Sequence, residues 1–218
     1  MPDAPVPAAE VVFASAEALP ARIGRDDRPL VVMPYIDAAA AKRSAVQMAR
    51  RAGMPVSVMC VADDRRRGFI AVANAVFRRT GAPFVAYVAQ DAFAGRGWLA
   101  HGVRALEARQ GGLLAFHDGK WAGALAAFGM VRGDWARSNY AGDLFHPGYR
   151  SHYADTELTV LAMAAGALRH DPQAMLVEVD WDKEASTVSP EDRALYKARA
   201  DAGFDGRVAD ARLRGMFG

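Results

Sequence analysis

The chain has 218 residues, 52% of them hydrophobic and 24% charged, which is typical of a protein with one sizeable core. The 27 basic and 25 acidic residues leave a net charge of +2, so no nucleic-acid partner is expected on electrostatic grounds. The single cysteine, Cys60, excludes an intrachain disulfide framework. The first ten residues lack a signal-peptide pattern and no apolar run could span a bilayer, so we expect a cytoplasmic protein without a transmembrane segment.

Residues 1–27 begin with a Pro- and Ala-rich stretch that predicts a loose tail. Strands and helices then alternate. The predicted strands are 30–33, 55–64, 83–91 and 112–121, and the predicted helices are 38–53, 68–81 and 97–112. Because the strands are unbroken apolar runs, both faces of the sheet should be covered. The pattern therefore predicts an α/β fold with a mainly parallel central sheet flanked by helices.

The second half of the chain is less regular. Residues 121–153 are rich in glycine and aromatic side chains, and no regular element is predicted there. A helix is expected over 154–168, because acids stand near its start and apolar residues follow at helical spacing. A strand is expected over 174–181, and an amphipathic helix over about 189–202 in the charged C-terminal segment.

Polar or punctuating residues stand where the first three strands end, namely Pro34 and Tyr35, Asp63 and Asp64, and Asp91. In an open α/β sheet, ligands bind at the carboxyl ends of the strands. The fold itself would place these three ends side by side. The sequence therefore predicts a ligand site at this edge of the sheet.

Five motifs in this order resemble the family 2 glycosyltransferases of the GT-A fold, over residues 28–181. They are "VVMPYID", "VADD", "GFIAVANAVFRRTG" with Asn74, "YVAQDAFAGRGWL" and "YADTEL". Two departures stand out. Gln90 occupies a position where the family often has a second acid, and the segment between the second strand and the Asn74 helix is much shortened.

The resemblance implies a glycosyltransferase that moves a sugar from a nucleotide-sugar donor to the hydroxyl of a saccharide or other acceptor. It implies an inverting reaction assisted by a divalent cation, Mn²⁺ or Mg²⁺. Residues 28–181 would form one GT-A-like domain, with a nucleotide-binding half (28–120), an acceptor half (121–181) and a C-terminal helical extension (182–218). Two alternatives stay open: a GT-A-like domain that binds or scaffolds without catalysis, and a nucleotidyltransferase, which the absence of glycine in "MPYIDAAAAKR" disfavours.

The resemblance also assigns candidate roles. Asp155 would be the catalytic base and Asp91 the metal ligand, since hard carboxylate oxygens suit Mg²⁺ and Mn²⁺. The nucleotide-binding candidates are Pro34, Tyr35, Asp63, Asp64, Arg67 and Asn74, and Arg66 could also approach the diphosphate. The acceptor-binding candidates are Trp98, His152 and Glu157.

Each candidate has a plainer interpretation. Asp91 could cap the turn after a strand, Asp155 could cap a helix, and Asp63 and Asp64 could form a solvated turn. Arg66 and Arg67 could belong to a solvated basic loop. His152 could serve as base or ligand in place of its neighbours, or as neither, and Trp98 could be a core residue.

Overall fold

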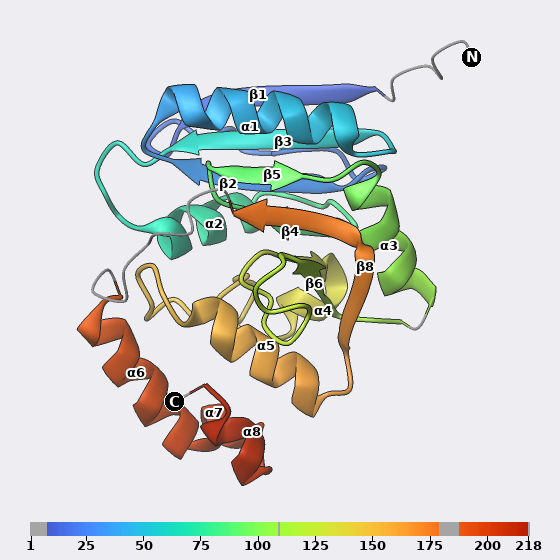
Figure 1. The fold of residues 1–218 in the computed structure, drawn as a ribbon. Coiled ribbons are helices and arrows are strands. Elements are labelled where there is room, and N and C mark those ends of the chain that lie inside the picture. Colours follow the sequence, from blue (N-terminus) through green and yellow to red (C-terminus); the bar gives the residue numbers. More distant parts are fainter. Residues whose placement is uncertain (1–7, 109, 179–187, 218) are drawn as a thin grey trace.

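The computed structural model describes residues 8–108, 110–178 and 188–217, and Figure 1 shows a central sheet with helices on both faces. The strands are β1 (Ala9–Ser15), β2 (Leu30–Tyr35), β3 (Val56–Ala62), β4 (Phe84–Tyr87), β5 (Ala92–Ala94), β6 (Leu113–His117), β7 (Gly129–Arg132) and β8 (Leu168–Glu178). The helices are α1 (Ala38–Arg51), α2 (Phe69–Phe77), α3 (Trp98–Ala108), α4 (Gly133–Arg137), α5 (Ala154–Ala164), α6 (Pro190–Asp201), α7 (Gly203–Gly206) and α8 (Ala211–Gly215).

Within the described residues, eight strands form one sheet in the order β1-β3-β2-β4-β7-β6-β8-β5. The pairs β1/β3, β2/β3, β2/β4 and β6/β8 are parallel, whereas β7 is antiparallel to both β4 and β6. The predicted α/β class with a mainly parallel sheet is confirmed. β2, β3 and β4 are parallel neighbours, so their carboxyl ends lie at the same edge.

Two hydrophobic cores lie on opposite faces of the sheet, because side chains alternate along each strand. In β2, Val31 and Met33 pack with α1 and α3, whereas Leu30 and Val32 pack with α2 and α5. Burial on both faces explains the unbroken apolar strands in the sequence. Asp37 caps α1 as expected, since its Oδ1 accepts hydrogen bonds from the backbone N–H groups of Ala39 and Ala40 at 2.9 and 3.1 Å.

The N-terminal segment differs from the predicted tail. Residues 1–7 lie outside the described residues, but Ala9–Ser15 form β1, which pairs in parallel with the whole of β3. Both of its faces are partly exposed, and Val12 and Phe13 are among the exposed apolar side chains. The hydropathy pattern of such an edge strand is weak, because the strand is defined more by its backbone hydrogen bonds to β3 than by burial of its side chains.

The irregular segment after β6 contains β7 and α4, which the sequence did not predict. β7 is four residues long, yet it occupies the centre of the sheet between β4 and β6, so a strand of the predicted acceptor half lies between two strands of the predicted nucleotide-binding half. Gly129 is required there, since a Cβ atom at this position would lie 2.4 Å from the Tyr87 hydroxyl oxygen. β8 begins six residues before the predicted strand 174–181, whose last three residues lie outside the described range.

The C-terminal helices lie against α5, below the sheet in Figure 1. Residues 179–187 fall outside the described part of the chain, so the predicted extension is seen from residue 188 onwards. Tyr196 of α6 and Phe204 of α7 are fully buried and belong to the core that also contains α2 and α5. Among the described helices, none is both long and apolar enough to cross a membrane.

Candidate functional site

The structure brings the ends of β2, β3 and β4 together. The backbone N–H of Asp63, which follows β3, donates to the carbonyl oxygen of Tyr35 at 2.9 Å. Gln90, which follows β4, accepts hydrogen bonds at its Oε1 from the backbone N–H groups of Ile36 and Asp37 at 2.8 and 2.9 Å. Gln90 therefore links the ends of β2 and β4, and its side-chain oxygen is bound by backbone N–H groups of the same chain.

Asp155, the candidate base, lies in the first turn of α5 beside the end of β4. Thr159 donates from Oγ1 to the carbonyl oxygen of Asp155 at 2.7 Å and accepts from the backbone N–H of Ala126 at 3.1 Å. The Tyr87 hydroxyl at the end of β4 donates to the carbonyl oxygen of Ala126 at 2.8 Å. This chain of contacts ties the start of α5 to the strand that leads to Asp91.

The carboxyl group of Asp155 is desolvated, although the residue as a whole is partly exposed. Burial raises the pKa of Asp155 from 3.8 to about 6, and hydrogen bonds from the backbone and from Thr156 oppose the rise. A carboxylate with a pKa near 6 is mostly ionised at neutral pH and is a stronger base than an ordinary aspartate. The site therefore provides a proton acceptor suited to neutral conditions.

Tyr153, the residue before α5, has a backbone conformation that residues other than glycine seldom adopt. Tyr153 has φ +65° and ψ −9°, in the left-handed region, where a bulky residue is an outlier. Its ring stacks on Tyr196 with centroids 5.0 Å apart, and its hydroxyl accepts a hydrogen bond from Nε of Arg193 at 3.1 Å. The surrounding contacts therefore hold a strained residue two positions before Asp155, and such strain concentrates at functional sites.

Asp91 is partly exposed and stands between Gln90 and β5. Across residues 8–108, 110–178 and 188–217, no group of three or more His, Cys, Asp or Glu side chains could hold a metal ion. An all-protein metal site therefore does not fit the described residues. A single carboxylate at a strand end does fit the way Mg²⁺ is usually held in phosphate sites, by one or two carboxylates together with substrate phosphates.

Of the paired acids after β3, only Asp64 faces outward. It is exposed and accepts a hydrogen bond from the Ser15 hydroxyl on the neighbouring strand β1. Tyr35 is partly exposed nearby, with its ring 6.0 Å from that of Phe13. Burial is the main cause that raises the pKa of Tyr35, and the Asp64 charge adds to it. Tyr35 and Asp64 thus form a polar group open to a ligand, next to buried Pro34.

Asp63, expected to bind nucleotide, is instead bound by its own loop. It is buried, and its Oδ1 and Oδ2 accept from the backbone N–H groups of Arg67 and Gly68, both at 2.8 Å. Arg67 was also expected at the nucleotide, but its guanidinium contacts the Ala16 carbonyl oxygen at 3.2 Å and the Glu17 carboxylate at 3.4 Å. The shortened loop is therefore closed by Asp63 from within and is tied by Arg67 to the segment that follows β1.

Asn74, a second nucleotide candidate, is buried and holds a distant loop. Its Oδ1 accepts from the backbone N–H groups of Leu144 and Phe145 at 3.1 and 2.9 Å, and its Nδ2 donates to the Phe145 carbonyl oxygen at 3.0 Å. An amide can satisfy both kinds of backbone group at once, which explains why an asparagine stands on an apolar helix. Asn74 is therefore buried away from solvent, where it holds the backbone of Leu144 and Phe145.

Trp98, expected at the acceptor, is a core residue. It is fully buried, its Nε1 donates to the Met48 carbonyl oxygen at 3.1 Å, and its ring lies 5.1 Å from that of Phe116. The tryptophan thus joins α3 to α1 and β6. A buried tryptophan needs a partner for its N–H, and the C-terminal part of α1 supplies it.

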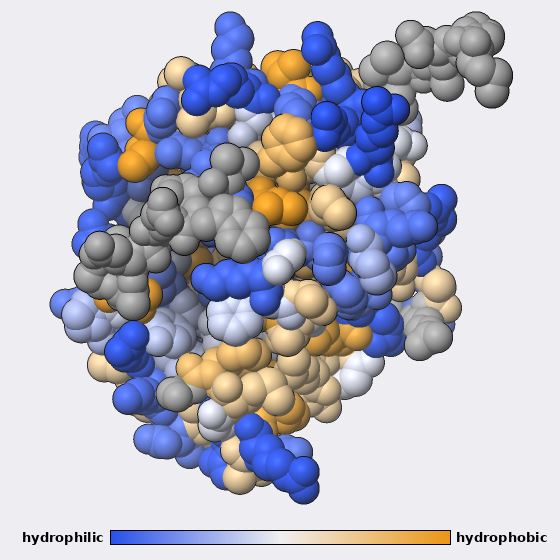
Figure 2. Space-filling model, viewed as in Figure 1, coloured by the Kyte–Doolittle hydropathy of each residue, from blue (hydrophilic) through white to orange (hydrophobic). Residues whose placement is uncertain are grey.

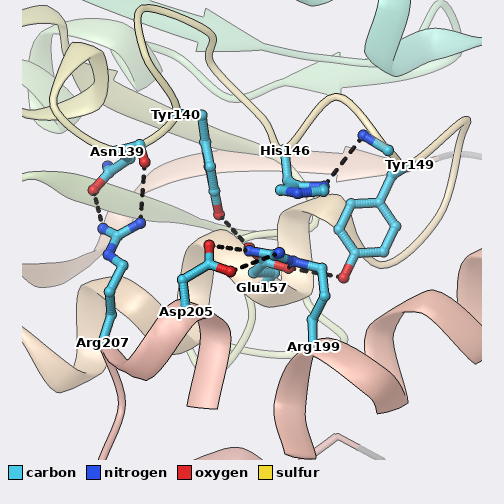
Figure 3. Close-up of polar contacts among 9 residues, drawn as sticks. Asn139, Tyr140, His146, Tyr149, Glu157, Arg199, Asp205 and Arg207 are labelled. Atoms are coloured by element: carbon cyan, nitrogen blue, oxygen red, sulfur yellow. Dashed lines mark hydrogen bonds and ion pairs between the residues drawn. The ribbon is translucent and has the colours of Figure 1, made fainter. Parts of the chain in front are cut away.

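Glu157, the other acceptor candidate, is fully buried in a polar network between α5 and the C-terminal helices (Figure 3). Arg199 of α6 binds both carboxylate oxygens, and the hydroxyls of Tyr140 and Tyr149 donate to them at 2.9 and 2.8 Å. We call these four residues the Glu157 network. Asp205 binds the outer side of Arg199. No open carboxylate oxygen remains to orient an acceptor, so that expectation is corrected.

His152 lies in the loop before α5, where the buried Asp192 of α6 holds the backbone. The carboxylate of Asp192 accepts from the N–H groups of Arg150, Ser151 and His152 at 2.9, 2.9 and 2.8 Å. Ser189 caps α6 by accepting from the N–H of Asp192 at 3.1 Å. The spacing of Ser189 and Asp192 is that of a capping box, but the sequence offered no sign that Asp192 binds a loop forty residues away.

The comparisons with known proteins concern the fold. The chain matches no protein-family model and no curated protein. Its structure is similar to TarS from S. aureus, with a TM-score of 0.62, 12% identity, and coverage of 86% of this chain and 41% of TarS. The chain thus spans less than half the length of TarS.

Two further solved structures carry ligands. A mannosyltransferase from Pyrobaculum calidifontis, in complex with GDP-Man and Mn²⁺, has a TM-score of 0.56 and 16% identity over 85% of this chain and 69% of its own. A mutant Drosophila β-1,4-galactosyltransferase 7, in complex with manganese, UDP-Gal and xylobiose, has a TM-score of 0.57 and 12% identity. The match covers 77% of this chain and 79% of the galactosyltransferase chain. The chain therefore has the fold of the GT-A-type glycosyltransferases.

Proposed function

We propose that this protein is an inverting glycosyltransferase of the family 2 type, which transfers a sugar from a nucleotide-sugar donor to an acceptor hydroxyl. The observation that carries the proposal is Asp155, a desolvated carboxylate beside the end of the strand that leads to Asp91. Support also comes from the similar structures, in which GDP-Man and UDP-Gal are bound with manganese.

In this reaction, the acceptor oxygen attacks the anomeric carbon and forms a new C–O bond there. The bond from that carbon to the diphosphate breaks, and the nucleoside diphosphate leaves with the electron pair. Asp155 takes the proton from the acceptor hydroxyl, which is a poor nucleophile until that proton is removed. Tyr35 and Asp64 would contact the nucleoside at the ends of β2 and β3.

Asp91 would hold a divalent cation jointly with the diphosphate oxygens. Such a cation would neutralise charge that develops on the leaving diphosphate. The role of Asp91 is to offer one hard anionic oxygen at the end of β4. Gln90 contributes no ligand, because its Oε1 is bound to the backbone of β2's end.

The test is nucleoside diphosphate release from a panel of nucleotide sugars, with and without Mn²⁺. Asp155→Asn is nearly isosteric but cannot accept the proton, so kcat should fall by about two to four orders of magnitude. The donor KM should change little. The parent rate should fall as the pH drops below about 6, where Asp155 is protonated, and the variant should lack this acidic limb.

The matched control is Asp210→Asn, which changes the aspartate that caps α8, a helix below the sheet in Figure 1. It should retain parental kcat and the acidic limb. Parental turnover in Asp155→Asn would assign the base to another group, of which His152 remains as a candidate from the sequence, since Glu157 is fully buried. Failure of every common donor to bind would count against the glycosyltransferase proposal as a whole.

A second candidate, a GT-A-like domain that binds nucleotide without catalysis, is favoured by one observation. Hydrogen bonds within the chain occupy the side chains of three residues that the family resemblance placed at ligands, namely Asp63, Asn74 and Glu157. The same panel separates the two functions. Nucleoside diphosphate bound by calorimetry, with no donor turned over by the parent, would support the binding domain.

A further inference from the structure

Helix α1 presents a face of exposed cations. Lys42, Arg43 and Arg50 are exposed, and their side chains make no hydrogen bond or ion pair with any described residue. Elsewhere the chain pairs many of its arginines, as in Arg25 with Asp27 and Arg132 with Asp134. The helix contains no acid between Ala38 and Arg51, so its positive charge is not offset within the helix.

Exposed apolar side chains lie on α1 itself and on the ribbon that packs against it. Val46 of α1, Phe93 of β5 and Met175 of β8 are 37%, 46% and 41% exposed. β5 pairs antiparallel with β8, and the backbone N–H of Gly95 donates to the Met175 carbonyl oxygen at 2.9 Å, so Phe93 and Met175 lie on one face of this ribbon. Asp37 and Asp91 stand directly before α1 and β5, and the acids of β8 are Asp171 and Glu178, of which Glu178 lies opposite Ala92 of β5.

The helix and the ribbon are held together as one surface. Gln47 donates from Nε2 to the Ala94 carbonyl oxygen at 2.6 Å and accepts from the Ala94 N–H at 3.0 Å. Arg51 donates to the same carbonyl oxygen at 3.0 Å, and its guanidinium lies 4.7 Å from the centre of the Phe93 ring. Figure 2 shows this side of the molecule, with apolar side chains gathered between hydrophilic ones.

We propose that this α1–β5 surface, formed by Lys42, Arg43, Val46, Arg50, Phe93 and Met175, binds the headgroup region of an anionic lipid membrane. Long basic side chains attract anionic lipids, and apolar side chains among them enter the boundary between headgroups and acyl chains. A surface that binds nucleic acid would instead carry hydrogen-bonding side chains, or aromatic side chains that stack on bases, between its cations. Here the interspersed residues are a valine, a methionine and one phenylalanine that already packs on Arg51.

The test is sedimentation of the full chain with vesicles of phosphatidylcholine alone, or of phosphatidylcholine mixed with phosphatidylglycerol. Binding is expected to the mixed vesicles only and should weaken as salt is added. Each cation near an anionic surface contributes about five-fold in affinity, so Lys42→Gln combined with Arg43→Gln should weaken binding about twenty-five-fold.

The matched control combines Lys197→Gln with Arg212→Gln, which removes one lysine and one arginine from exposed positions on α6 and α8. It should bind as the parent does, and both double variants should keep the parental melting temperature. Equal loss in the two double variants would mean that only net charge matters, and would overturn the proposal. So would equal binding to the two kinds of vesicle.

Insertion of the apolar residues is tested separately with Phe93→Trp. Brominated lipids should quench its added fluorescence relative to the parent on mixed vesicles, and a lack of extra quenching would contradict insertion at this face. A single-stranded oligonucleotide tests the other class of partner. If the Lys42 and Arg43 variant lost affinity for the oligonucleotide and not for vesicles, the surface would bind nucleic acid and the membrane proposal would be wrong.

Discussion

Arg199 of α6 binds both carboxylate oxygens of the fully buried Glu157 of α5, with Nε–Oε2 and Nη2–Oε1 distances of 2.7 and 2.8 Å. The pKa of Arg199 is raised above its usual range, mainly because Arg199 donates hydrogen bonds to Glu157. This fork geometry is the strongest form of an arginine–carboxylate pair. It joins the C-terminal helices to the first turn of α5, two residues beyond Asp155.

Removal of Arg199 should strongly destabilise the fold. Arg199→Met would leave the Glu157 charge buried with only the two tyrosine hydroxyls as partners, at a cost of about 3–5 kcal/mol in the free energy of unfolding. Glu157→Gln combined with Arg199→Met removes both charges and should be clearly more stable than Arg199→Met alone. Denaturant unfolding measures both. Arg212→Met, on exposed α8, is the control, and a loss in Arg199→Met no larger than in this control would show that the pair contributes nothing.

The stability of the fold should depend on the charge of Asp155. Its pKa is raised from 3.8 to about 6, so the folded state binds this proton more tightly than the unfolded state does. The stabilising effect of the bound proton is fully present below pH 3.8 and is lost as the pH rises to about 6. At pH 7 the buried carboxylate therefore destabilises the fold.

Asp155→Asn should accordingly raise the free energy of unfolding at pH 7 by about 1–2 kcal/mol, less than the full pKa shift implies because the residue is partly exposed. The difference between variant and parent should nearly vanish at low pH. Denaturant unfolding at both pH values measures it. A variant that is destabilised at neutral pH would show that the carboxylate serves mainly as a helix cap.

Asn74 should matter for stability and not for ligand affinity. Asn74→Ala leaves the N–H groups of Leu144 and Phe145 and the Phe145 carbonyl without their partner, and each buried orphan costs about 1–3 kcal/mol. Unfolding should therefore be easier by several kcal/mol, while nucleotide affinity of the folded protein stays unchanged. Gln173→Ala, at an exposed position of β8, is the control. Weaker nucleotide binding with parental stability would restore Asn74 to the ligand site.

Asp91 should govern the effect of metal on nucleotide binding. Asp91→Asn keeps the size of the side chain but removes the anionic oxygen that Mg²⁺ and Mn²⁺ prefer, so the gain in nucleoside diphosphate affinity with Mn²⁺ should fall about ten-fold or more. Calorimetric titration with and without Mn²⁺ measures the gain. Asp210→Asn should behave as the parent. If Asp91→Asn keeps the full metal effect, Asp91 is only a turn residue, and Arg66 becomes the candidate that neutralises the diphosphate.

The order of elements could be predicted from the sequence because it depends on near neighbours. Unbroken apolar runs indicate buried strands, and Asp37 before an Ala-rich segment indicates where α1 begins, since a cap acts on N–H groups within three residues. The position of Asp155 in the first turn of a helix, and the meeting of three strand ends, follow from the same local pattern and from parallel topology. β1, β5 and β7 were missed, because each is defined by long-range pairing more than by its own composition.

Only the tertiary structure decided which of the candidate polar residues are buried against the chain and which stay open to solvent. Asp63 and Asp64 are adjacent in sequence, yet Asp63 is buried under the loop that ends at Gly68, whereas Asp64 points outward to Ser15. Glu157 is taken up by Arg199, which lies 42 positions away along the chain. A polar side chain costs free energy when it is buried without a partner, so its role depends on which distant groups the fold brings within hydrogen-bond distance. Local sequence does not contain that information.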